Sequence, residues 1–152
     1  MGMICLAGCA PLGLSFEGDR RLRGGDIDGA MSAYGESLDA RSSPRTLKKL
    51  EDARALKAQA LTEEGISAGG RGDHEDAFRL LSRALALNPH DLIALDALDD
   101  ARDALLQEAQ RADITLQFER SLELYELILS QYRRETAAQE GAQKARRALA
   151  QA

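Results

Sequence analysis

A spacing of turn, small and large apolar residues that recurs three times constrains this fold more than any other feature. The copies are Gly25-Asp26 with Ala30, Tyr34 and Leu38; Gly72-Asp73 with Ala77, Leu81 and Leu85; and Leu116-Gln117 with Ser121, Tyr125 and Leu129. The small residues of successive copies are 47 and 44 residues apart. A second mark repeats in nearly the same step, namely Ala53-Arg54, Ala101-Arg102 and Ala145-Arg146. Periods of this size indicate stacked supersecondary units.

The middle copy shows what each residue of the repeated pattern does in a hairpin of two helices. Gly72 lacks a Cβ and can adopt the left-handed conformation that ends a helix, and Asp73 can then cap the next helix. Ala77 is small, so a paired helix can approach closely, and enlarging it to Leu would cost about 1–3 kcal/mol by overpacking. Pro89 stops the second helix. The unit therefore predicts an antiparallel helical hairpin.

The composition agrees with an all-α fold. Ala, Leu, Arg, Glu and Gln dominate, β-branched residues are sparse, and no alternating apolar run indicates a strand. A chain of 152 residues, 44% hydrophobic and 30% charged, is of ordinary size for one folded domain. An alternative is a different bundle of amphipathic helices in which Gly, Asp and Pro mark generic turns.

These marks resemble the tetratricopeptide repeat family, whose pattern places Gly, Ala, a large apolar residue and Pro at these relative positions. The matching residues are Leu61, Gly65, Gly72, Ala77, Leu81, Ala84 and Pro89 in the middle copy and Leu14, Gly18, Gly25, Ala30, Tyr34 and Leu38 in the first. The third copy departs from the family, with Ala109 and Leu116 in place of glycine, Ser121 in place of alanine, and no proline after Tyr132. The resemblance implies a short solenoid of stacked hairpins.

The period is longer than the family unit of about 34 residues, and lengthened helices would explain the difference because roughly eleven residues make three helical turns. Ser43-Pro44 is a helix-start signal. We expect a leader over 1–10 and a repeat domain over 11–152, with copies near 11–44, 45–90 and 91–133. The expected helices are 27–40, 45–68, 75–87, 91–112, 118–132 and a closing helix over 135–150.

The family resemblance also implies a concave groove lined by the first helix of each hairpin. The corresponding residues are Gln59, Thr62, Glu63 and Ile66 in the middle copy and Leu106, Gln107, Gln110 and Asp113 in the third. This lining is polar and aliphatic and lacks the Lys, Arg and Asn of the members that clamp C-terminal carboxylates. It favours a protein or peptide partner with an apolar or helical segment. The alternative is that Ile66 and Leu106 are ordinary core residues.

The N-terminus carries a second resemblance, because Leu6-Ala7-Gly8-Cys9 is similar to the lipobox of bacterial lipoproteins. It implies lipidation of Cys9 and attachment to the periplasmic face of an envelope membrane, with Ala10 favouring the outer membrane. Only eight residues precede Cys9 and none is basic, unlike a secretory signal. Either translation begins upstream, or the match is accidental and the protein is a cytoplasmic adaptor with an unmodified Cys9.

Charge and motif content limit the other classes of function. With 25 acidic and 20 basic residues the net charge is −5, which disfavours nucleic acid as a partner. His74 and His90 sit at predicted turns outside any catalytic motif. An acidic stripe, Asp96, Asp99, Asp100 and Asp103, lacks the loop and glycine of a calcium site and is interpreted as a solvated face. The sequence predicts a non-enzymatic binding protein without cofactor or metal, and a small helical enzyme is a remote alternative.

Overall fold

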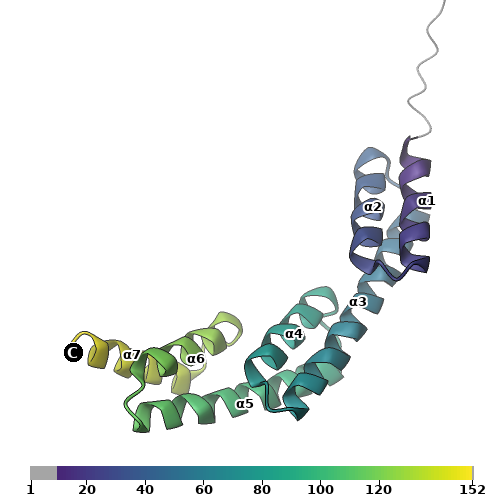
Figure 1. The fold of residues 1–152 in the computed structure, drawn as a ribbon. Coiled ribbons are helices and arrows are strands. Elements are labelled where there is room, and N and C mark those ends of the chain that lie inside the picture. Colours follow the sequence, from purple (N-terminus) through teal and green to yellow (C-terminus); the bar gives the residue numbers. More distant parts are fainter. Residues whose placement is uncertain (1–9, 152) are drawn as a thin grey trace, which may run out of the picture. The chain divides into compact units, whose positions relative to one another are not determined.

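The computed structural model describes residues 10–151, and within them the chain is built of helices without a strand (Figure 1). The helices are α1 Ala10–Arg23, α2 Ile27–Ala40, α3 Pro44–Gly70, α4 His74–Leu87, α5 Leu92–Ile114, α6 Phe118–Gln131 and α7 Thr136–Leu149. The long helices α3 and α5 have 27 and 23 residues, and each alternates with a helix of 14 residues. The expected all-α fold of antiparallel hairpins with lengthened helices is confirmed.

The chain divides into two compact units. The first contains residues 10–60 and 87–89 of the described part, and the second contains residues 61–86 and 90–151. Helix α3 contributes its first part to unit 1 and its last part to unit 2. The expected leader and the expected limits of the repeat domain stay predictions, since residues 1–9 lie outside the described part.

The helices of unit 1 are α1, α2 and the first part of α3. Helix α2 packs on α1, and the core cluster contains Ala30, Tyr34, Leu50 and Ala53, so α2 also packs on the start of α3. Gly18 of α1 lies directly against Tyr34, where an added Cβ would overlap the aromatic ring. Close approach of the two helices therefore depends on the missing side chain at this position.

Unit 2 repeats this arrangement with more helices. Helix α5 contacts both α6 and α7, and α6 contacts α7. The core contains Phe78, Leu81, Leu105, Leu124 and Ile128, each at most 1% exposed. Gly141 of α7 lies against the ring of Tyr125, as Gly18 does against Tyr34 in unit 1. A tyrosine thus packs against a glycine in both units, with the glycine on the preceding helix in unit 1 and on the following helix in unit 2.

Both repeated marks in the sequence fall in the core. The small residues Ala30, Ala77 and Ser121 are at most 1% exposed. The alanines of the second mark are buried as well, namely Ala53, Ala101 and Ala145. Small side chains recur because helices must approach closely at these points in every copy.

Candidate functional site

A groove of about 330 Å³ opens in unit 2 where the end of α3 and α4 meet the first half of α5. Its lining consists mostly of glycine and alanine. The residues are Gly65, Ile66, Gly69, Gly70, His74, Ala77, Leu81, Ala97, Asp100 and Ala101. A groove walled by backbone and methyl groups allows a ligand to come close to the helices.

The local packing explains why the groove is lined by residues with small side chains or none. A Cβ on Gly65 would stand 2.7 Å from Cγ of Leu81, so the groove floor has no room for a side chain there. On α5 the facing residues are Ala97, which is half-buried, and Ala101, which is 4% exposed. The repeat pattern that places small residues in the core therefore also produces the groove.

Two side chains give the groove its chemical character. Ile66 is 45% exposed and adds a large apolar side chain to the lining. Asp100 is exposed and has neither a hydrogen bond nor an ion pair within residues 10–151. An apolar contact beside an unpaired carboxylate suits a ligand that carries an apolar side chain and a cation.

The acidic stripe of α5 is only partly neutralised. Arg102 makes ion pairs with Asp99 at 2.7 Å and with Asp103 at 2.9 Å. The same guanidinium group lies 4.8 Å from the centroid of the Tyr132 ring, and the Tyr132 hydroxyl donates to Asp99 at 2.6 Å. Asp99 and Asp103 are therefore paired with Arg102, whereas Asp100 at the groove has no such partner.

Most of the eight residues that the sequence predicted for the partner groove do not line the groove of unit 2. Ile66 lines the groove described above. Gln59, Glu63, Gln107 and Gln110 are exposed and Leu106 is half-buried, but none of them lines it.

Thr62 and Asp113, predicted for the same surface, are buried at 5% and 8% exposure. The Thr62 hydroxyl donates to Asp91 at 3.2 Å, and the Tyr125 hydroxyl donates to Asp113 at 3.3 Å. These two residues hold neighbouring helices together and do not belong to an exposed lining.

Sequence reasoning missed the α5 wall of the groove. It placed the lining on the second half of α5 by transferring the repeat from α3, which selected Leu106 and Gln107. In the structure the first half of α5, with Ala97, Asp100 and Ala101, faces the end of α3. The acidic stripe was the one signal on this half of the helix, because it contains Asp100.

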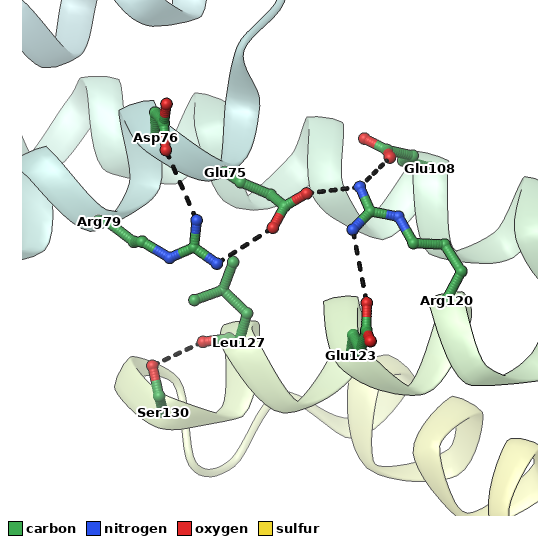
Figure 2. A network of polar contacts seen from close by, with 8 residues as sticks. All are labelled: Glu75, Asp76, Arg79, Glu108, Arg120, Glu123, Leu127 and Ser130. Atoms are coloured by element: carbon green, nitrogen blue, oxygen red, sulfur yellow. Dashed lines mark hydrogen bonds and ion pairs between the residues drawn. The ribbon is translucent and has the colours of Figure 1, made fainter.

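A separate set of charges braces the helices of unit 2, as Figure 2 shows. Arg120 of α6 donates to Glu75 of α4 at 2.5 Å and to Glu108 of α5 at 2.8 Å, so one guanidinium group joins three helices. Burial raises the pKa of Glu75, but the hydrogen bonds and positive charges of Arg120 and Arg79 together outweigh it, and the net pKa lies below the ordinary value. Since the basic groups already have carboxylate partners, we interpret this cluster as a structural brace.

The histidines and acidic residues of the described part are not arranged as a metal centre. No group of three or more His, Cys, Asp or Glu side chains in residues 10–151 is arranged to hold a metal ion. His74 begins α4 and His90 lies beyond its end, so the two histidines do not form one site. In the same region, none of the helices has both the length and the apolar character needed to cross a bilayer.

Comparison with known proteins gives little further information. No family model matches the chain, and no curated protein does. Among solved structures it is similar to the crystal structure of MamA protein, with 22% sequence identity over 94% of this chain and 84% of that chain, and a TM-score of 0.31. At this level the similarity identifies neither a family nor a function.

Proposed function

We propose that this protein is a non-enzymatic adaptor of the tetratricopeptide type, which binds a short helical segment of another protein in the groove of unit 2. The observation that carries the proposal is the partly exposed Ile66 in a groove whose lining is mostly glycine and alanine. Small residues allow a helix to lie close to the walls, and Ile66 supplies an apolar contact for it.

The groove favours a particular class of segment. Asp96 and Asp100 are exposed, stand one helical turn apart on α5, and have no ion-pair partner within residues 10–151. A segment with an apolar side chain for Ile66 and a Lys or Arg for Asp100 would complement both. Binding would then shift the assembly equilibrium of the partner without chemistry on a substrate.

The test begins with a display library of short helical peptides selected on the intact protein. Affinities of the selected peptides are then measured by fluorescence anisotropy for the wild type and for Ile66→Asp. We expect a loss of about 10-fold or more, because the apolar contact is replaced by a charge. Asp100→Asn should cause a smaller loss and weaken the dependence of affinity on salt.

Ile114→Asp is the matched control, since Ile114 is an equally apolar residue of α5 that is 81% exposed and does not line the groove. Its peptide affinities should stay within about twofold of the wild type. Circular dichroism establishes that both variants keep their helices. Equal affinities of Ile66→Asp and wild type, with both proteins folded, would refute the groove assignment.

The location of the adaptor is a separate part of the proposal. Attachment at the periplasmic face of an envelope membrane rests on the Leu6-Ala7-Gly8-Cys9 resemblance alone, which lies outside the described residues. Mass spectrometry of the native protein tests it. An acylated Cys9 at the N-terminus of the mature chain is expected, and a non-acylated Cys9 in membrane fractions would leave the cytoplasmic adaptor.

A further inference from the structure

A second hollow, of about 560 Å³, lies within unit 1 between α1, the end of α2 and the start of α3. It is unlike the groove of unit 2, because its walls are basic and hydroxylic. The residues that matter are Arg41, Ser42, Ser43, Arg45, Thr46 and Lys49. Phe16 of α1, which is 66% exposed, adds one apolar wall.

The one carboxylate in this hollow is already neutralised. Lys49 makes an ion pair with Asp19 at 2.6 Å, and the Tyr34 hydroxyl donates to the same carboxylate at 2.8 Å. Burial raises the pKa of Asp19, but these two hydrogen bonds and the positive charges of Lys49 and Arg23 together outweigh it, so the net pKa lies below the ordinary value and the group stays ionised. Among the cations that line the hollow, Asp19 therefore offsets Lys49.

Arg41 and Arg45 are left as the uncompensated charges of the hollow. Both are exposed, and neither guanidinium group has a hydrogen bond or ion pair within residues 10–151. Guanidinium groups are rigid forks of N–H donors that match the oxygens of an oxyanion. The hollow thus presents two unpaired cations of the type best suited to such a group.

Thr46 supplies an independent observation. Thr46 is 5% exposed and lines the hollow, and its hydroxyl makes no hydrogen bond with any residue of the described part. Its backbone N–H donates to Oγ of Ser43 at 3.3 Å, which leaves the hydroxyl itself without a partner. Among the described residues the fully buried side-chain oxygen without a partner is Asp113 Oδ1, so the Thr46 hydroxyl is an unused donor that solvent or a ligand in the hollow can reach.

The backbone favours the same kind of ligand. Pro44 begins α3, a helix of 27 residues, so the hollow lies at the positive end of a long helix dipole. The Ser42 and Ser43 hydroxyls flank this helix start. Cations, free hydroxyl donors and the helix N-terminus converge on one recessed volume.

We infer that the hollow of unit 1 binds a phosphate monoester, with Arg41 and Arg45 contacting the phosphate oxygens and Thr46 donating its hydroxyl. A phosphate group has enough oxygens to accept from both guanidinium groups and from the hydroxyl at once, which a single carboxylate does less well. Thr46 is recessed and the net charge of the chain is −5, so a soluble phosphate ester fits better than a flat anionic bilayer. The inference concerns another unit and does not depend on the proposed peptide groove.

The test uses the whole protein labelled with ¹⁵N. Inorganic phosphate and, in a second arm, a tripeptide with a central phosphoserine are titrated while amide shifts are followed. Saturable shifts centred on residues 41–49 are expected in at least one arm, and the stronger arm tells whether the natural ester is small or carried by a peptide. Absence of saturable shifts in both arms would overturn the inference, as would binding to anionic vesicles without binding of either soluble phosphate.

Three variants distinguish phosphate binding in the hollow from nonspecific attraction to positive charge. Arg45→Gln should weaken phosphate binding by about 10-fold, and Thr46→Val by about 5-fold, as expected for a charged and a neutral hydrogen bond. Arg54→Gln removes an exposed arginine of α3 outside the hollow and should leave the affinity unchanged. Equal losses in Arg54→Gln and Arg45→Gln would show nonspecific attraction and contradict the site. If Thr46→Val does not fold, Arg41→Gln at an exposed position decides the same question.

Discussion

The turn after α3 and the turn after α5 have the same backbone but different sequences. In the first, Gly72 N–H donates to the Gly69 carbonyl at 3.0 Å and Asp73 N–H donates to the Ala68 carbonyl at 3.0 Å. In the second, Leu116 and Gln117 donate in the same pattern to Asp113 at 3.2 Å and Ala112 at 2.9 Å. The hydrogen bonds that close the hairpin are therefore kept where the glycine and aspartate of the pattern are lost.

The second turn bears a conformational cost that the first avoids. Gly72 has φ of +86°, which glycine adopts freely, whereas Leu116 is held at +58°, a conformation that a side chain opposes. Gln117 makes no side-chain capping bond, while Asp26 at the equivalent turn after α1 accepts from Gly29 N–H at 2.8 Å. Packing of the two helices dictates the turn, and the local sequence decides how much stability the turn contributes.

The largest expected effect comes from making the first turn like the second. Gly72→Leu should lower the free energy of unfolding by about 1–2 kcal/mol, because a leucine would be forced into the left-handed conformation. An added Cβ at Gly72 would meet no atom within 4 Å, so the change isolates backbone strain. Urea unfolding followed by circular dichroism measures it, and a variant as stable as the wild type would mean that this turn can relax.

The reverse change should stabilise the protein. Leu116→Gly relieves the same strain at a side chain that is 73% exposed, and we expect a gain of about 1 kcal/mol after the added flexibility of the unfolded chain is counted. Leu116→Ala is the control, since it removes the exposed side chain and keeps the strained conformation. Equal stability of the Gly and Ala variants would attribute the gain to the loss of exposed apolar surface.

The smallest expected change in stability concerns the N-cap of α6. Gln117→Asp should add about 0.5 kcal/mol by giving α6 the side-chain cap that Asp26 gives α2. The gain should disappear when the pH falls below the pKa of the new carboxyl group, since the charged acceptor interacts best with the helix N-terminus. Asp26→Asn serves as the matched control at the other turn, because it keeps an acceptor without the charge. A pH-independent gain would contradict the electrostatic part of this reasoning.

Much of the fold could be predicted because its determinants are local. The spacing of small and large residues located the buried faces, and Asp26, Pro44 and Gly72 marked helix ends to within about two residues. The expected helix over 27–40 agrees with α2, and the expected long helix over 45–68 differs from α3 by a few residues. The turn at Leu116 could be placed only by analogy, since no local residue favours it.

The candidate site was less predictable because its walls come from helices that are distant in sequence. Ile66 could be selected from the repeat, but Thr62 and Asp113 are buried and hydrogen-bonded to residues outside their own helices, namely Asp91, the N-cap of α5, and Tyr125 of α6. The hollow of unit 1 is assembled from α1, the loop after α2 and the start of α3, and no single sequence window contains it. Spacing identifies helix faces, whereas the meeting of faces depends on tertiary packing.

The most direct test of the binding function is amide shift mapping of a selected helical peptide on the ¹⁵N-labelled protein. We predict the largest changes at residues 65–70 and 97–101, the two walls of the groove in unit 2. Changes centred instead on Leu106, Gln107 and Gln110, or spread evenly over the exposed helix faces, would contradict the assignment of this groove.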